Sequence, residues 1–527
     1  MTRAWDVIVL GSEPDALAAA TYLARAGRRV LVLEPRELLG GSMVTQELVP
    51  GCRVDAVFDD LGWVAPAVVA ELDLARHGLE LLHPDPMLTA PARHGGHLAL
   101  WRDIERTRTS IRSLSTRDAE RWPEFVMVMA KHAALLETIC TSPAPRPTSP
   151  GTDDLRSVVR LAQQVGFGGR ADLLEFVRTL PMSIGELLDD WFESDTLKGA
   201  LAAGGISGLM QGPRSGGTAF LFLHRHVGGA PGAVRRRQVA RGGTGCLVDA
   251  LAAAARAAGV QLRCGAGVER ILTRDARVQG VVLANGDELT APRVLSGADA
   301  RTTLLELSDP LALDPEVVHA VRHIRHRGQL ARVHLAVDEL PRVRGLNGDG
   351  LAAGAVVIAP SIADLERAWD DAKYGRVSAR PWLEVSIPTI ADPTRAPDAT
   401  HLLSVSVQYV PHTLREGEWT SERRDALGNL VVDLLAEYAP GLRDSIIERR
   451  VLAPCDLESC YGLREGAPDQ GEMTLDQILF MRPLPGWAHY RTPIEGLWMC
   501  GAATHPGGRM PGTSGRLAAR EMLRDRT

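Results

Sequence analysis

The sequence predicts an α/β fold in two domains, one Rossmann-like and the other α+β with an antiparallel sheet. Three observations lead to this prediction. The chain has 527 residues, which is more than a single hydrophobic core usually holds. Residues 6–34 carry the pattern of a strand, a glycine turn, a helix and a second strand. Between residues 310 and 480, strand patterns are mixed with helical ones, as in an α+β domain.

The opening unit has the clearest pattern. Residues 6–10 form a short apolar run, as expected for a strand buried on both faces, and Gly11 turns the chain. Residues 16–26 are rich in Ala and Leu and end before Gly27, a natural helix C-cap. Residues 30–33 form a second apolar strand. Together these elements predict a βαβ unit with parallel strands.

The later elements follow from periodicity and turn residues. A glycine turn at residues 241–245 precedes an Ala/Leu helix at 247–258, and Asn285-Gly286 predicts a hairpin turn. A Pro/Ser-rich stretch at residues 141–152 predicts a loop. Further helices are expected at 118–138, within 155–201, and at 361–371, 423–438 and 516–523. Further strands are expected at 261–264, 268–273, 278–283, 288–295, 329–337, 382–387, 401–409 and 496–500.

Composition narrows the function classes. A formal net charge of −6 gives no electrostatic reason to expect a nucleic-acid partner. The seven cysteines include no Cys-x-x-Cys pair and the histidines show no ligand spacing, so no metal site is predicted. The sequence has no apolar run of about 18 residues and no signal-peptide pattern at its start. We therefore expect a cytoplasmic protein, with peripheral membrane contact through helices around residues 118–210 as an extension of that expectation.

A dinucleotide site is indicated by the first βαβ unit. Such a site needs a glycine turn after the first strand and an acidic residue after the second, where it binds ribose hydroxyls. Gly11 and Glu34 match these two roles, and Gly40-Gly41 follow closely as further backbone donors.

Glu13 departs from the expected glycine pattern. Residues 11–16 read GSEPDA where G-x-G-x-x-G is usual. Ala16 is an accepted third residue, but Glu13 replaces the glycine that lets the backbone approach a pyrophosphate. At about 4 Å and an effective dielectric near 20, one like-charge pair costs on the order of 4 kcal/mol.

The same residues also allow a different interpretation. Ser12 and Asp15 are spaced as in a capping box, with Pro14 in the first turn. The helix would then satisfy its own N-terminus with side chains, as phosphate does in a dinucleotide-binding protein. This leaves open a scaffold that has weakened or lost its cofactor site.

Longer motifs resemble the phytoene-desaturase-like family of FAD-dependent oxidoreductases. The C-terminal run GLWMCGAATHPGGRMPGTSGR at residues 496–516 is similar to the terminal FAD-binding signature of that family. LLGGSMVTQELVPG at 38–51, RGGTG at 241–245 and LDQILFMRPLPG at 475–486 occur in the right order. Within that family, these blocks resemble the branch named pyridine nucleotide-disulfide oxidoreductase domain-containing protein 2. Residues 466–471, GAPDQG, depart from the family, where an Asn and an aromatic-His pair are expected.

The resemblance implies where FAD would bind. Gly40 and Gly41 would lie near the ribityl-pyrophosphate stretch, and the Val268 backbone would contact the adenine. Gly501 and the turn to Gly515 would run along the flavin. The residues expected to bind FAD are Gly11, Ser12, Glu34, Gly40, Gly41, Val268, Gly501, Met510 and Gly512.

The order of the motifs also predicts the domains. The FAD-binding domain, an FAD/NAD(P)-binding Rossmann-like domain of the GR2 type, is expected to be discontinuous, at residues 1–75, 235–300 and 486–527. The substrate domain would then comprise residues 76–234 and 301–485.

The expected function is that of an FAD-dependent oxidoreductase of the desaturase or dehydrogenase kind. A hydride would pass to the flavin from an apolar substrate, isoprenoid or lipid-like, and then to an electron acceptor such as a quinone or oxygen. No catalytic acid or base stands out in the sequence. Two alternatives use the same fold, a non-catalytic scaffold and a carrier of an apolar ligand, in which Glu13 has weakened or abolished FAD binding.

Overall fold

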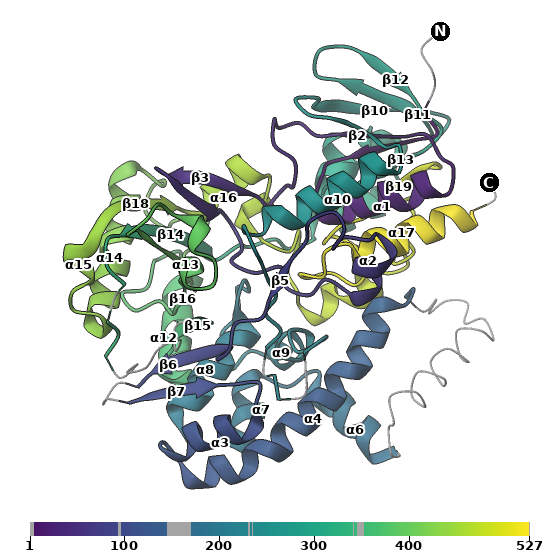
Figure 1. Cartoon of the computed structure of the whole chain (residues 1–527). Coiled ribbons are helices and arrows are strands. Elements are labelled where there is room, and N and C mark those ends of the chain that lie inside the picture. Colours follow the sequence, from purple (N-terminus) through teal and green to yellow (C-terminus); the bar gives the residue numbers. More distant parts are fainter. Residues whose placement is uncertain are drawn as a thin grey trace.

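The computed structural model describes residues 5–92, 96–144, 170–229, 232–233, 235–340, 342–344 and 353–525 (Figure 1). The expected loop at 141–152 lies outside the described residues from position 145 onward, as do residues 155–169 of the expected helical region. Within the ranges given above, every helix is too short or too polar to cross a lipid bilayer.

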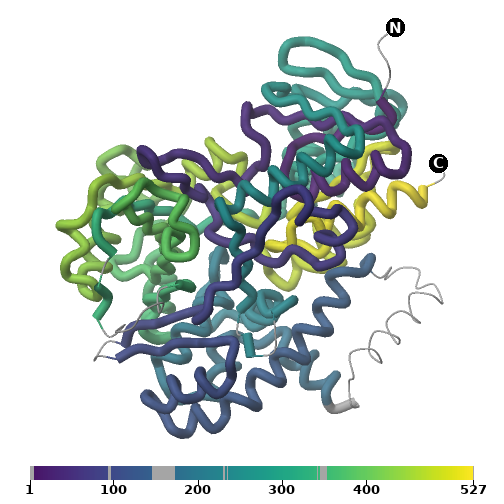
Figure 2. Tube along the Cα trace, viewed as in Figure 1, coloured from purple at the N-terminus to yellow at the C-terminus, as the bar shows by residue number. Residues whose placement is uncertain are grey.

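A five-stranded parallel sheet forms the first part of the molecule. Its strand order is β19 (Leu497–Met499), β13 (Val294–Ser296), β1 (Val7–Leu10), β2 (Val30–Leu33) and β9 (Gln261–Arg263). Three stretches that lie far apart in the sequence therefore supply one sheet. Figure 2 shows the two ends of the trace, purple and yellow, side by side in this region.

The alternating side chains of β1 explain how this sheet is covered. Val7 and Val9 face α1 (Pro14–Arg25), which packs with α10 (Gly245–Ala257) and α17 (Thr513–Arg524). Ile8 and Leu10 face the opposite core cluster, which includes residues of a three-stranded antiparallel sheet. That sheet consists of β10 (Val268–Arg274), β11 (Arg277–Leu283) and β12 (Glu288–Thr290). Both faces are thus buried, as the unbroken apolar run predicted.

The single strand expected at residues 288–295 is two strands that belong to different sheets. β12 pairs with β11, whereas β13 pairs with β1 and β19. Pro292 lies in the break, where its missing N–H cannot serve a ladder. The chain crosses from one layer to the next at this point.

The second part is built on a seven-stranded sheet in which five of the six strand pairings are antiparallel and the sixth, between β6 and β15, is parallel. The order is β18 (Ile446–Leu452), β14 (Leu330–Val337), β17 (His401–Gln408), β16 (Leu383–Ser386), β15 (Ala355–Ile358), β6 (Leu88–Pro91) and β7 (His97–Leu100). The predicted α/β fold with an antiparallel sheet in its second part is confirmed. The remaining strands form two pairs, β3 (Thr45–Val49) with β4 (Cys52–Asp55) and β5 (Leu81–Leu82) with β8 (Val239–Ala240).

Several helices gather beside the second sheet, at the lower end of the view in Figure 1. They are α3 (Ile104–Arg112), α4 (Thr116–Thr141), α6 (Arg170–Thr179), α7 (Ile184–Trp191), α8 (Asp195–Ile206) and α9 (Thr218–His224). The others are α2 (Pro66–Glu71), α11 (Pro315–Arg322), α12 (Ile362–Lys373), α13 (Pro388–Ala391), α14 (Ser421–Tyr438), α15 (Leu442–Ser445) and α16 (Pro454–Tyr461).

The β3–β4 hairpin lies against the second sheet although it is close in sequence to β1 and β2. Val49 and Val54 pack with Ala336 of β14 and Leu402 of β17. The chain thus passes between the two parts within its first 75 residues. The domain division at residues 1–75, 235–300 and 486–527 stays a prediction.

Candidate functional site

The carboxyl ends of the parallel strands meet at one edge of the first sheet. Gly11 follows β1 and donates its amide to the Leu33 carbonyl at 2.8 Å. Gly297 follows β13 and donates to the Leu10 carbonyl at 2.8 Å. In open parallel sheets, ligands bind at this edge. The structure therefore brings Gly11, Glu34 and Gly501 to the edge where a dinucleotide would bind.

Ser12 connects two of the predicted site residues. Its hydroxyl donates a short hydrogen bond to the buried carboxylate of Glu34 and accepts one from the Gly40 amide at 2.9 Å. Glu34 Oε1 also accepts the Arg36 amide at 3.1 Å and Arg36 Nε at 3.2 Å. The glycine turn, the end of β2 and the Gly40-Gly41 turn are thus tied together.

The capping interpretation of Ser12 and Asp15 is wrong. The α1 N-cap is Glu13, which makes no side-chain capping bond. Ser12 instead bonds to Glu34 and Gly40, and Asp15 Oδ1 accepts the Gly515 amide at 3.0 Å, at the start of α17. Both side chains therefore bond to residues that are remote in sequence. For Asp15, the reason is that the fold brings the N-terminus of α17 against α1.

Asp15 thereby places a negative charge at the positive end of α17. Burial raises the pKa of Asp15 to about 6, while hydrogen bonds from the Gly515, Gly512 and Ser514 amides lower it. Gly512, with φ +82°, is the N-cap of α17, and Met510 is buried just before it. Gly501 donates its amide to Ser514 Oγ at 3.1 Å. Gly501, Met510 and Gly512 therefore lie together at this helix start.

Glu13 lies against Gly41. A Cβ added at Gly41, whose φ is +59°, would overlap the Glu13 side chain. The half-buried Glu13 carboxylate has its pKa raised to about 7, first by burial and second by the charge of Asp15. Glu13 therefore fills the space beside the Gly40-Gly41 turn, next to the position expected for the pyrophosphate.

Gln470 bridges three loops around Glu13. Its Nε2 donates to Glu13 Oε2 at 3.3 Å and to the Gly297 carbonyl at 3.0 Å, and its Oε1 accepts the Ala503 amide at 3.0 Å. The sequence marked residues 466–471 as a departure from the family, but it carried no sign of this contact.

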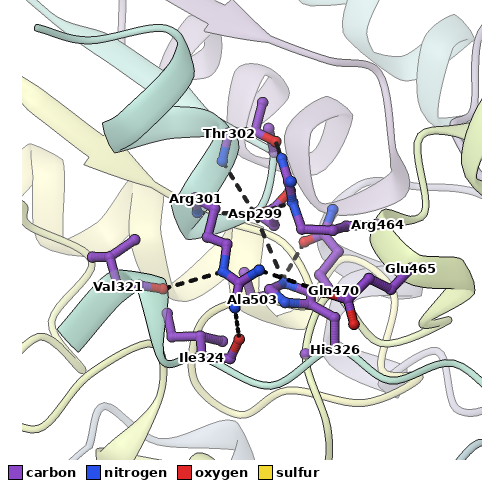
Figure 3. Close-up of polar contacts among 12 residues, drawn as sticks. Asp299, Arg301, Thr302, Val321, Ile324, His326, Arg464, Glu465, Gln470 and Ala503 are labelled. Atoms are coloured by element: carbon purple, nitrogen blue, oxygen red, sulfur yellow. Dashed lines mark hydrogen bonds and ion pairs between the residues drawn. The ribbon is translucent and has the colours of Figure 1, made fainter. Parts of the chain in front are cut away.

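A polar network holds the loop after β13 (Figure 3). Asp299 accepts the amides of Arg301 at 2.9 Å and Thr302 at 3.1 Å, and Arg464 Nε lies 3.4 Å from it. Arg301 in turn donates to the Ile324 carbonyl at 2.6 Å. The loop that carries Gly297 is thus fixed from both parts of the molecule.

Val268 lies farther along the same edge, at the start of β10. The Ala266 amide donates to the Glu34 carbonyl at 2.9 Å, and the Ala284 amide to the Gly267 carbonyl at 2.8 Å. Val268 is therefore close to the end of β2 but is not in the group formed by Gly11, Ser12 and Gly40.

Two adjoining cavities lie between the C-terminal loop and the seven-stranded sheet, and Arg225, Arg235, Asp469 and Arg509 line both. Arg332 of β14 and Glu384 of β16 reach the first cavity, and His224 at the end of α9 reaches the second. Burial and neighbouring arginines hold the pKa of His224 well below its usual value, so its imidazole is neutral. Charged groups thus form much of the wall.

The sequence did not identify this charged wall. Arg332 lies inside the apolar run of β14 and Glu384 inside that of β16, and both are almost fully buried. A charge inside a buried strand needs a partner, so these two positions were available signals, as were Asp59-Asp60 and the run 235–237. Within the described residues, no group of three His, Cys, Asp and Glu side chains is placed to hold a metal ion.

The residues at the sheet edge fit FAD in most respects. A Cβ on Gly40 would come within 2.7 Å of the Met43 carbonyl oxygen, so the close approach there requires glycine. A Cβ on Gly11 would meet no atom within 4 Å, so that position borders open space. Glu34 offers a buried carboxylate for ribose hydroxyls. The Glu13 carboxylate is the part of this fit that must move or take up a proton.

Comparison with known proteins agrees with this geometry. The family model described as flavin containing amine oxidoreductase matches residues 17–523. Pyridine nucleotide-disulfide oxidoreductase domain-containing protein 2 of Rattus norvegicus is 32% identical, over 99% of this chain and 94% of that protein. One of the limonene dehydrogenase subunits of Castellaniella defragrans is 26% identical, over 99% of this chain and 94% of that protein.

Two further comparisons extend this result. Phytoene desaturase (lycopene-forming) of a Paracoccus species is 28% identical, over 54% of this chain and 55% of that protein. The structure of putrescine oxidase bound to putrescine covers 99% of each chain, with a TM-score of 0.61 and 18% identity, and so shares the fold. The expected resemblance to phytoene-desaturase-like proteins is confirmed. The chain belongs to the flavin-containing amine oxidoreductase family and is an FAD-dependent oxidoreductase.

Proposed function

We propose that the chain holds FAD along the edge of the parallel sheet and oxidises a C–H bond of an organic substrate in the cavities beside the C-terminal loop. The observation that carries this proposal is the meeting of Gly11, Glu34 and Gly501 at the carboxyl ends of β1, β2 and β19. The proposed FAD-binding residues are Gly11, Ser12, Glu34, Gly40, Gly41, Val268, Gly501, Met510 and Gly512.

The chain supplies binding, orientation and exclusion of water. Glu34 would accept hydrogen bonds from ribose hydroxyls, and Gly512, the N-cap of α17 with φ +82°, would let the backbone approach the ring closely. Bound FAD supplies an acceptor for one hydride, which carries two electrons. Desaturation also removes a proton from the neighbouring carbon, as the new double bond forms, and Asp469, which lines both cavities, is the carboxylate proposed to accept it.

The proposed substrate has an apolar body, isoprenoid or lipid-like. The names of the limonene dehydrogenase and phytoene desaturase relatives support this choice. Val57, Phe58 and Leu330 add apolar surface to the charged cavity wall. The proposed final electron acceptor is a quinone or oxygen.

The test uses the FAD-loaded full chain under anaerobic conditions, with limonene and phytoene as probes. We expect one of the probes to bleach the visible flavin absorbance, and added quinone or oxygen to restore it. If an external reductant bleaches the flavin but neither probe does, an apolar C–H substrate of these two classes is rejected.

A second candidate function has its own support. The Glu13 carboxylate and the Gln470 amide occupy the region beside Gly41 and satisfy each other there. A scaffold or apolar-ligand carrier would need no cofactor in that space. Titration with FAD separates the two candidates, because the carrier would bind a probe such as limonene equally well with and without added FAD.

We also propose that the protein is cytoplasmic and contacts membranes peripherally through α4 and α6. Met127 of α4 and Leu173, Leu174 and Val177 of α6 are exposed apolar side chains, and the Lys131–Asp172 ion pair joins the two helices. Flotation with phosphatidylcholine vesicles tests this contact. The Leu174→Asp/Val177→Asp variant should lose vesicle binding, and equal flotation of the two proteins would contradict it.

A further inference from the structure

The charges around the first cavity are mostly paired. Asp59 forms a short ion pair with Arg332, Asp60 lies 3.3 Å from Arg509, and Glu384 accepts Arg235 Nη2 at 2.9 Å. Phe58 also lies under the Arg509 guanidinium, 5.2 Å from ring centroid to Cζ. The charges of these acids and bases neutralise one another, so the paired residues shape the cavity but add no unpaired charge to its wall.

Arg225 is not neutralised in this way. It is 8% exposed, and its Nη2 donates to the Ser207 carbonyl at 2.8 Å. Its Nη1 is buried and has no hydrogen-bond partner within the described part of the chain, although the residue lines both cavities. A buried guanidinium N–H without an acceptor costs free energy, and a ligand oxygen in the cavity would remove that cost.

The charges near Arg225 make this position suited to an anion. Burial, together with the charges of Arg509 and Arg235, lowers the pKa of Arg225 to about 9, although Asp469 and Glu384 act in the opposite direction. Arg235 and Arg509 are themselves paired with Glu384 and Asp60, so the positive charge of Arg225 itself is the feature that suits an anion. Guanidinium groups in such surroundings are the usual binders of carboxylates in proteins.

Asp469 is the complementary unpaired group. It is 8% exposed, its Oδ1 has no partner among the described residues, and it forms no ion pair with Arg225 within 4.0 Å there. Its backbone carbonyl is held by Arg482, which fixes the residue in place. An unpaired cation and an unpaired carboxylate thus line the same two small cavities, whose volumes are about 30 and 10 Å³.

We propose that this space binds a carboxylate of the substrate at Arg225. The proposal rests on the proposed function, since it places the acid group of an otherwise apolar molecule beside the C-terminal loop. The substrate is then an amphipathic carboxylic acid whose acid group occupies this small space and whose hydrocarbon body extends beyond it. A phosphate ester carries more negative charge than one guanidinium group can neutralise, so we infer that a carboxylate is the better match.

The test compares four probes with the same eight-carbon chain by titration calorimetry on the FAD-loaded full chain. We expect octanoate to bind at least about tenfold more tightly than methyl octanoate or octan-1-ol, the effect of one charge-assisted hydrogen bond. Equal binding of octanoate and its ester would overturn the proposal. Tighter binding of octyl phosphate than of octanoate would also overturn it and would assign the site to phosphate.

Variants locate the site. Arg225→Gln should weaken octanoate binding about ten- to a hundredfold, and Arg225→Lys should retain part of it. Asp469→Asn should tighten octanoate binding about tenfold, because a nearby like charge is removed. This gain of binding cannot arise from misfolding. Arg241→Gln is the control, since Arg241 is exposed and pairs with Glu80. If neither Arg225→Gln nor Asp469→Asn changes the affinity for octanoate, the proposed site is wrong.

The outcome is separable from that of the proposed function. The same octanoate titration on protein without FAD reports on the cavity alone, and FAD absorbance reports on the cofactor. Octanoate binding that depends on Arg225 without any FAD uptake would sink the proposed oxidation but keep the anion site. FAD uptake without octanoate binding would reject the anion site but leave the proposed oxidation standing.

Discussion

Glu13 Oε2 accepts a hydrogen bond from Gln470 Nε2 at 3.3 Å, although 457 positions separate the two residues in the chain. Glu13 begins the first helix of the parallel-sheet region, and Gln470 lies in a loop after the seven-stranded sheet. This contact links the two departures from the family pattern. Because the glycine usual at position 13 leaves no side chain for such a bond, we infer that the two positions function together.

The first prediction concerns FAD affinity. Glu13→Gly and Glu13→Gln should both bind FAD more tightly than the unaltered protein at pH 8, by about tenfold or more, because each removes a charge beside the pyrophosphate. The unaltered protein should gain affinity as the pH falls through about 7, where Glu13 takes up a proton. The variants should show no such gain. Calorimetric titrations at pH 6 and 8 check this, and equal affinities at both values would mean that Glu13 turns away.

The second prediction concerns stability without FAD. The pKa of Glu13 is raised from 4.5 to about 7, so the folded chain keeps a proton that the unfolded chain loses. The contribution of Glu13 to stability is therefore fully present below pH 4.5 and is lost as the pH rises through about 7. Glu13→Gln removes this loss and should be more stable by about 1–3 kcal/mol at pH 8 but not at pH 4.5. Urea unfolding of both proteins at the two pH values measures the difference, and a constant difference would refute it.

The third prediction concerns Gln470. Gln470→Ala should lower the free energy of unfolding by about 1–3 kcal/mol, because it leaves the Gly297 carbonyl and the Ala503 amide without their side-chain partner. Gln279→Ala, at an exposed position on β11, is the control and should change it by less than about 0.5 kcal/mol. A Gln470→Ala protein as stable as the control would show that water replaces both bonds.

The fourth prediction compares two Arg–Glu pairs. Glu384 is buried between Arg235 and Arg237, so Glu384→Ala leaves two buried guanidinium groups and should cost about 3–5 kcal/mol. Glu437 pairs with Arg380 at 2.9 Å but is exposed, so Glu437→Ala should cost about 0–1 kcal/mol. Denaturant unfolding of both variants gives the comparison. Similar losses at the two sites would contradict the importance of burial.

The sequence allowed the first part of the fold to be predicted because its signals are local. An apolar run, Gly11, an Ala-rich helix and Glu34 occur within 34 residues, and the strands they predict are those observed. The split of residues 288–295 was missed because periodicity does not show which sheet a strand joins. Only Pro292 carried a hint of the break.

The site could be predicted only in part, for a related reason. Gly11, Ser12 and Gly40 were recognised by motif, but the partners of Ser12 and Asp15 come from the folded chain and not from the helix that they precede. The charged cavity depends on the register of β14 and β16, which places Arg332 and Glu384 on the face toward the C-terminal loop. Contacts of that range have no local signature.

The most direct test of the account is the absorbance of the purified full chain after incubation with excess FAD at pH 6 and removal of free cofactor. We predict the visible bands of a bound oxidised flavin at about one FAD per chain, with a higher occupancy for Glu13→Gly at pH 8. A protein that retains no flavin at pH 6, and whose Glu13→Gly variant also retains none, would contradict FAD-dependent catalysis by this chain.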